Sequence, residues 1–132
     1  VWIFDIDTDR ISEPARELSD KATSPLGVIA IIFTVGLLAP VAEELFFRGL
    51  LYGSIRKRGD SAKSQKVIVW TSVIISSAIF SAIHFQLLLF PALFVVGMIF
   101  ALIYERSQRL ASAIWAHVGF NATTLFSLLV LD

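Results

Sequence analysis

Six side chains that can perform acid–base or hydrogen-bonding chemistry lie within otherwise apolar stretches of the sequence. They are Glu43, Glu44, Arg48, His84, His117 and Asn121. A charged group at the centre of a bilayer costs roughly 3 kcal/mol or more, so several in one short chain require partners or a water-filled cavity. The set therefore predicts an inward-facing cavity with a catalytic or ion-handling role, in preference to packing alone.

The two glutamates of this set differ in their spacing from a cation. Glu44 precedes Arg48 by four residues, which is the acid-before-base order that brings an ion pair together on a helix. Glu43 lies about 100° round the helix from Glu44, and no Lys or Arg stands three or four residues from it. We expect Glu44 and Arg48 to be structural support, and Glu43, an unpaired carboxylate, to act as a general base or acid.

The histidines and the asparagine complete the set. His117 and Asn121 are four residues apart, so they share one helix face and can donate hydrogen bonds to a developing oxyanion. His84 shares its predicted face with Ser77 and Ser81, small residues that allow close helix approach, and it can orient a water against the unpaired glutamate. Either histidine alone is equally well explained as a packing residue, so the prediction depends on the joint pattern.

The composition indicates that membrane helices position these residues. Of 132 residues, 56% are hydrophobic and 17% are charged, against roughly 45–50% and 25% in soluble domains. Eleven Lys plus Arg balance 11 Asp plus Glu, which excludes a nucleic-acid binder and a disordered chain. Cysteine is absent, which excludes disulfides, thiolate zinc sites and cysteine nucleophiles.

Uncharged stretches set the number of membrane spans. Residues 67–104 contain no Asp, Glu, Lys or Arg. As a single helix they would run about 57 Å, nearly twice the roughly 30 Å of a hydrocarbon core, so the chain must reverse, and Pro91 places the reversal between Gln86 and Pro91. Four spans are expected, at 26–52, 67–85, 90–104 and 110–131. None alternates polar and apolar residues, so the predicted fold class is an all-α, polytopic membrane helical bundle.

Charges between the spans indicate the orientation. Segment 56–66 carries five cations against one anion, and 105–109 two against one, so both are expected in the cytoplasm. Residues 1–25, with six acids and three bases, are then an extracytoplasmic loop or surface helix, and 26–132 form the membrane core. With these bounds His84 lies about 25 Å from the cytoplasmic side, against about 10–20 Å for the unpaired glutamate and the second histidine. Either the second span begins inside the cytoplasm or its bounds shift by several residues.

Three motifs on successive spans resemble one known family. Residues 43–48 (EELFFR) match EExxxR, 80–84 (FSAIH) match FxxxH, and 117–121 (HVGFN) match HxxxN. In this order they resemble the intramembrane CAAX-protease and bacteriocin-processing family, also called CPBP or Abi, to which the Ras-converting endopeptidase belongs. The resemblance covers about 26–131 and implies a helical-bundle peptidase with a polar cavity inside the membrane.

Carried over by position, the resemblance implies a role for each motif residue. Glu43 would activate water with help from His84. His117 and Asn121 would stabilise the oxyanion, and the ion pair of the first motif would support them. The implied reaction is hydrolysis of a peptide bond in membrane-associated substrates, lipidated or not, in a bacterial-type cytoplasmic membrane. The expected partners are lipid and such peptides or proteins, with no nucleic acid.

The family resemblance leaves cofactor, completeness and function class open. Members usually have roughly eight spans, so further helices are expected outside this sequence, which begins at Val1 and not at Met. Two histidines and a carboxylate can hold a divalent ion such as zinc, but no HExxH is present and a glutamate-activated water can work alone, so a metal-free mechanism is preferred. A proton or ion carrier, and a non-catalytic scaffold or immunity-type protein of the same fold, remain alternatives.

Overall fold

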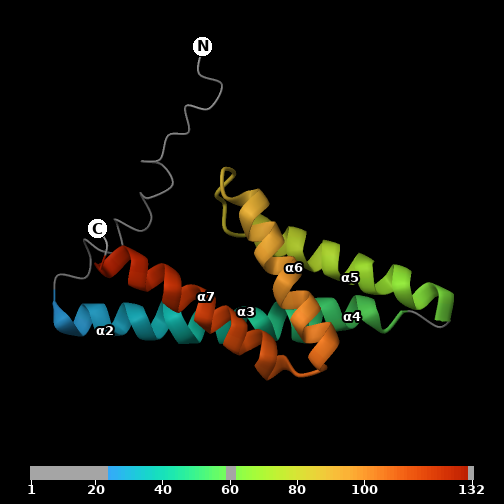
Figure 1. Ribbon diagram of the computed structural model, residues 1–132, viewed down its shortest axis with the longest axis horizontal. Coiled ribbons are helices and arrows are strands. Elements are labelled where there is room, and N and C mark those ends of the chain that lie inside the picture. Colours follow the sequence, from blue (N-terminus) through green and yellow to red (C-terminus); the bar gives the residue numbers. More distant parts are fainter. Residues whose placement is uncertain (1–23, 59–61, 131–132) are drawn as a thin grey trace, which may run out of the picture.

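The computed structural model describes residues 24–58 and 62–130, which form helices joined by short turns, with no strand among them (Figure 1). The predicted all-α class is confirmed. Residues 1–23 lie outside the described residues, so the acidic extracytoplasmic segment stays a prediction. The first helix is continuous from Pro25 to Arg56, over 32 residues. Its successive segments are α2 (Pro25–Phe33), η1 (Thr34–Leu38), α3 (Ala39–Glu44), η2 (Leu45–Tyr52) and α4 (Gly53–Arg56).

Two stretches of this first helix, η1 and η2, have the wider π-type turn. The helix begins where the Ser24 hydroxyl accepts a hydrogen bond from the Gly27 N–H at 3.1 Å, just ahead of Pro25. The first wide stretch leads into Pro40, which has no N–H and whose ring crowds the carbonyl four residues earlier, and the wide turn relieves that conflict. The second follows Glu44 directly, and π-type turns are frequent at functional sites.

Three further helices follow the first: α5 (Ala62–Ala82), α6 (Phe90–Ser107) and α7 (Leu110–Val130). Pro91 lies in the first turn of α6, and the reversal before it occupies residues 83–89, which overlaps the predicted position. α5 ends at Ala82 and not at residue 85, because Phe85 has a φ of 53°, a left-handed conformation that a continuing helix cannot include. His84 therefore lies in the turn, which corrects its predicted place on the helix.

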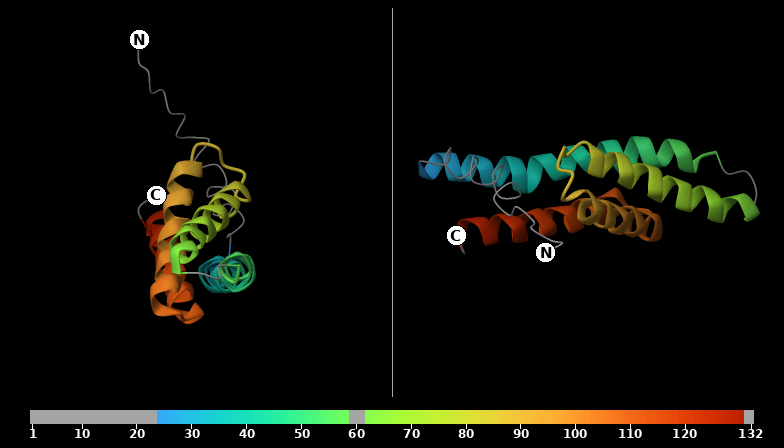
Figure 2. Two further views of the ribbon diagram at one scale, coloured as in Figure 1. Left: turned by 90° about the vertical axis from the view of Figure 1, so that its right-hand side faces the viewer. Right: turned by 90° about the horizontal axis from the view of Figure 1, so that it is seen from above.

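The relative lengths of the helices bring this turn about halfway along the long axis of the bundle, at its edge (Figure 1). α5 starts beyond the end of α4 and runs back until it ends beside α3 (Figure 1). α7 runs along the first helix and contacts α3 and η1, whereas α5 contacts chiefly α6. The second view of Figure 2 shows α6 and α7 on one side of the first helix. α5 begins at Ala62, inside the segment predicted to be cytoplasmic. The Phe80 ring near its end lies 4.8 Å from the His84 ring and 5.7 Å from the His117 ring, so the turn that holds His84 lies near the second histidine.

The outside of the bundle is apolar, as contact with lipid requires. Within the described residues, three helices are long and apolar enough to cross a membrane: Pro25–Arg56, Ser64–Ala82 and Phe90–Ser107. α7 has 21 residues but carries two polar site residues and is not among the three. Large side chains such as Trp70 and Trp115 are exposed along the surface. The predicted helical membrane bundle is confirmed, and the chain is an integral membrane protein.

Two clusters of buried side chains join the first helix to α5 and α6. They are Phe47, Phe80 and Phe100, and Tyr52, Val73 and Ala101. Four serines of α5 are buried as well, and their small size allows α6 to approach closely. At the last turn of α6, Glu105 accepts from the Tyr52 hydroxyl at 2.7 Å and pairs with Arg56 at 3.2 Å, which ties α6 to the first helix.

Gly97 marks a close approach between α5 and α6. A Cβ at this position would lie 3.2 Å from Cα and Cβ of Ser77 and from Cδ1 of Phe80. We expect Gly97→Ala to destabilise the fold by about 1–3 kcal/mol, the usual cost of overpacking, measured by thermal or SDS-induced unfolding in micelles. Gly119→Ala is the matched control, because a Cβ there would meet nothing within 4 Å. Similar losses in both variants would contradict this account.

Candidate active site

The acid–arginine pair of the first motif is formed and buried. Arg48 Nη1 donates to Glu44 Oε1 at 2.8 Å, and both side chains are 0% exposed. Arg48 Nη2 donates to the Gly97 carbonyl of α6, also at 2.8 Å. The guanidinium thus connects the first helix to α6 while its charge is neutralised within its own helix.

Aromatic rings surround the same guanidinium. Its carbon lies 5.9, 5.2 and 5.5 Å from the ring centroids of Phe47, Phe80 and Phe100. A cation within about 6 Å of an aromatic face is stabilised by the ring quadrupole, most of all where water is excluded. These rings belong to the first helix, α5 and α6, so the charge is held by all three elements.

His117 of α7 joins the pair and faces the other glutamate. Its Nδ1 lies 2.8 Å from Glu44 Oε1, and its Nε2 lies 3.7 Å from Glu43 Oε2. A carboxylate only accepts, so we assign the ring proton to Nδ1, which leaves the lone pair of the neutral ring on Nε2. The ring stacks on Phe100 at 4.6 Å, with 24° between the planes, which orients it. One glutamate holds the imidazole, and the other lies beside its free nitrogen.

Glu43 is the most exposed residue of this arrangement. Its side chain is 26% exposed, whereas Glu44 and His117 are almost fully buried. Buried polar atoms without a hydrogen-bonding partner include Glu43 Oε2, Glu44 Oε2 and Arg48 Nε. Such atoms are usually satisfied by ordered water or by a ligand. Three of them on one short segment indicate a polar space in which water or substrate can bind.

Asn121 is turned toward the first helix by a defect in that helix. Its Nδ2 donates to the Val35 carbonyl at 2.8 Å. In the wide turn of η1, the Ala39 N–H bonds to the Thr34 carbonyl, and the next residue, Pro40, has no N–H to offer to Val35. The asparagine side chain supplies the missing donor and ties α7 to the first helix, one turn away from His117.

His84 is held by the end of its own helix. Its backbone N–H bonds to the Ser81 carbonyl at 3.3 Å, and its Nδ1 lies 2.7 Å from the Phe80 carbonyl that the backbone has released. Because a carbonyl only accepts, Nδ1 carries the proton and Nε2 is free. The Phe80 ring lies between the two histidines, with centroids 4.8 Å from His84 and 5.7 Å from His117.

The structure thus brings four of the six predicted residues into direct contact or near contact. These are Glu43, Glu44, Arg48 and His117. The Phe80 ring lies between His84 and His117, and Asn121 lies one turn from His117. Both His84 and Asn121 bond to backbone carbonyls. Two functional partners were missed: the Gly97 carbonyl, and Glu44 as the acceptor for His117. Sequence spacing carries no signal for a contact across 73 residues.

The contacts among the donor side chains bear on how a metal ion could bind here. The described residues hold no group of three or more His, Asp or Glu side chains placed to bind one ion. Glu44 Oε1 and His117 Nδ1 are already bonded to each other, and Arg48 takes the same oxygen. A catalytic zinc typically needs three protein ligands, and the metal-free mechanism stays a prediction.

Comparisons with known proteins identify relatives of this chain. Residues 25–123 match the family model described as type II CAAX prenyl endopeptidase Rce1-like. The membrane-embedded CAAX protease MroQ of Staphylococcus aureus (strain USA300) is 33% identical over 99 residues, which is 74% of this chain and 39% of that protein. The putative membrane peptidase YdiL of Bacillus subtilis (strain 168) is 28% identical over 123 residues, 91% of this chain and 44% of the relative.

More than half of each relative lies outside the part that matches this chain. An uncharacterized 24.3 kDa protein of Escherichia coli is 35% identical over 101 residues. These residues make up 74% of this chain and 43% of the Escherichia coli protein. The chain therefore spans less than half the length of the curated relatives it matches. No solved structure matches the chain.

Proposed function

The chain belongs to the Rce1-like family of type II CAAX prenyl endopeptidases, and from that premise we propose that it forms the catalytic core of an intramembrane endopeptidase. The proposed reaction is hydrolysis of a peptide bond in a membrane-associated substrate, lipidated or membrane-embedded. The printed names of two relatives, a CAAX protease and a putative membrane peptidase, support this class of function. Their bacterial sources support a bacterial cytoplasmic membrane as the location, with lipid and peptide or protein substrates as partners.

The arrangement of two glutamates about His117 carries this proposal. Glu44 fixes the ring through Nδ1, and Glu43 lies 3.7 Å from Nε2 on the more exposed side. A general base needs an accessible proton acceptor held in place by groups that do not themselves react. Glu43 is the more accessible carboxylate, at 26% exposed, and Glu44 with Arg48 holds the neighbouring imidazole in place.

In the proposed first step, Glu43 takes a proton from a water molecule as the water oxygen attacks the carbonyl carbon of the scissile bond. The free Nε2 of His84 helps to orient that water. The carbonyl oxygen takes the negative charge of the tetrahedral intermediate. In the second step, the carbon–nitrogen bond breaks and the proton held by Glu43 passes to the leaving nitrogen. The products are a carboxyl end and an amino end, so the atoms of one water are accounted for.

The proposed oxyanion contacts depend on the protonation of His117. Because Glu44 holds the ring proton at Nδ1, Nε2 can donate to an oxyanion only when the ring is an imidazolium. Asn121 keeps a second N–H after donating to Val35, and we assign that N–H to the oxyanion.

The proposed function is tested with the full-length protein in sealed vesicles that contain a membrane-anchored peptide. We expect new peptide termini by mass spectrometry and no proton flux, because the proposed reaction passes its proton to the substrate and not along a relay. His84→Asn is expected to keep a donor for the Phe80 carbonyl but to lose the free Nε2, so that kcat falls by about 100-fold or more with little loss of stability. Proton flux without new termini would establish the carrier function instead.

A further inference from the structure

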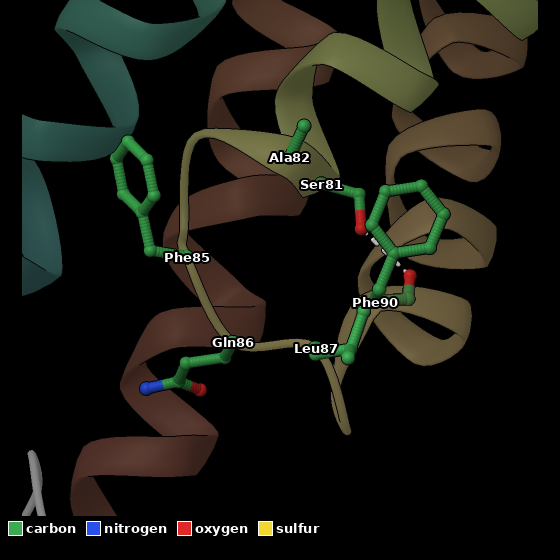
Figure 3. Close-up of a pocket in the computed structure, with 6 residues that line it drawn as sticks. All are labelled: Ser81, Ala82, Phe85, Gln86, Leu87 and Phe90. Atoms are coloured by element: carbon green, nitrogen blue, oxygen red, sulfur yellow. Dashed lines mark hydrogen bonds between the residues drawn. The ribbon is translucent and has the colours of Figure 1, made fainter.

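A hollow of about 300 Å³ lies at the turn between α5 and α6 (Figure 3). Its lining residues are Ser81, Ala82, Phe85, Gln86, Leu87 and Phe90. Ligand pockets typically measure about 300–1,000 Å³, so this one suits a single large side chain better than a whole ligand. The proposed water-orienting residue, His84, belongs to the same turn and immediately precedes Phe85.

Phe85 occupies this turn in a way that packing within the described residues does not explain. Its φ of 53° lies in the left-handed region, where glycine is the usual residue after a helix because a Cβ is disfavoured. Its ring is 93% exposed, and the Leu87 side chain is 88% exposed. Figure 3 shows the rings of Phe85 and Phe90 on opposite sides of the turn. Phe85 and Leu87 thus stand in the same turn as His84 without filling a core.

We propose that this hollow binds an apolar side chain of the peptide substrate next to the scissile bond. The inference rests on the proposed peptidase function. Successive residues of an extended peptide rise about 3.3 Å, so a peptide whose carbonyl is attacked by the water beside His84 can bring an adjacent residue to the same turn. The lining is mostly apolar, because Ala82, Phe85, Leu87 and Phe90 contribute to it. Such a lining fits an apolar side chain of the size of Leu or Phe.

The polar lining fits the backbone of the same substrate. The Ser81 hydroxyl donates to the Phe90 carbonyl at 2.6 Å and is already engaged. The Gln86 side-chain amide has no hydrogen-bonding partner among the described residues. Figure 3 shows the Gln86 amide on the outer side of the turn, directed away from Ser81 and Phe90. An amide both donates and accepts, as does a peptide group, so Gln86 can bond to a substrate main chain that passes along this side.

The test uses full-length protein in vesicles and anchored peptides that differ only in one residue flanking the scissile bond, as Ala, Leu or Phe, on each side in turn. Leu87→Trp narrows the hollow and is expected to lower kcat/KM for the Leu and Phe peptides by about 10-fold or more relative to the Ala peptide. Phe85→Ala widens it and should shift the preference toward Phe. Leu88→Trp is the matched control, because Leu88 is exposed in the same turn but does not line the hollow.

Each outcome decides the proposal. Unchanged preference in both variants, or an equal loss for all peptides, overturns it. A change limited to prenylated peptides, with none for the same unlipidated sequences, assigns the hollow to a lipid chain and also overturns it. If Leu87→Trp does not fold, as judged by gel filtration, the preference of Phe85→Ala decides. Absence of cleavage by the unaltered protein overturns the proposed function and this inference together.

Discussion

Replacing Glu43 with glutamine is expected to lower kcat by about 100- to 10,000-fold, the range that a positioned general base contributes. Glutamine has nearly the same shape, but its amide cannot take a proton from water. The carboxylate is 26% exposed and makes no hydrogen bond through Oε2, so the change leaves no buried partner unsatisfied. Stability should therefore stay within about 0.5 kcal/mol of the unaltered protein. Single-turnover cleavage of an anchored peptide measures the chemical step directly.

Glu105→Gln makes the same chemical change away from the active site. Glu105 accepts from Tyr52 and pairs with Arg56, so its replacement should cost stability while the chemical step is largely retained. The two variants are therefore expected to respond in opposite ways. A Glu43→Gln enzyme that cleaves within a few-fold of the normal rate would remove this residue from the mechanism.

The helices could be predicted from the sequence because a membrane helix is marked by the hydropathy and length of a whole segment and not by single residues. The reversal before Pro91 also follows from a local property, the missing N–H of proline. The end of α5 could not be placed, because there a side chain competes with the backbone: His84 takes the Phe80 carbonyl that a longer helix would have used. The start of α5 at Ala62 was missed because charged residues can extend a membrane helix into the cytoplasm.

In the candidate site, too, contacts set by local spacing could be predicted, and contacts set by helix packing could not. The pairing of Glu44 with Arg48 could be predicted, because residues four apart on one helix meet whatever the rest of the fold does. The bond from His117 to Glu44 depends on how α7 packs against α3, which no local pattern encodes. Asn121 was predicted as a free donor, yet the wide turn before Pro40 leaves a carbonyl that captures one of its N–H groups. Defects in a helix ladder therefore redirect polar side chains on its neighbours.

Glu44 is expected to be the residue whose loss most reduces stability. In Glu44→Gln, Arg48 stays buried with its charge uncompensated, and removal of one partner from a buried pair costs about 3–5 kcal/mol. His117 loses its charged acceptor in the same step. We expect a large fall in the midpoint of SDS- or heat-induced unfolding in micelles, together with loss of cleavage.

The double variant Glu44→Leu with Arg48→Met separates the two roles of this carboxylate. Removal of both charges leaves no unpaired ion, and replacement of a buried pair by apolar residues is often neutral or stabilising, so most of the lost stability should return. Cleavage should not return, because Nδ1 of His117 still lacks the oxygen that orients the ring toward Glu43. Recovery of both properties would show that Glu44 only neutralises Arg48. Recovery of stability alone would show that Glu44 also positions His117, a role that its place between a cation and an imidazole requires.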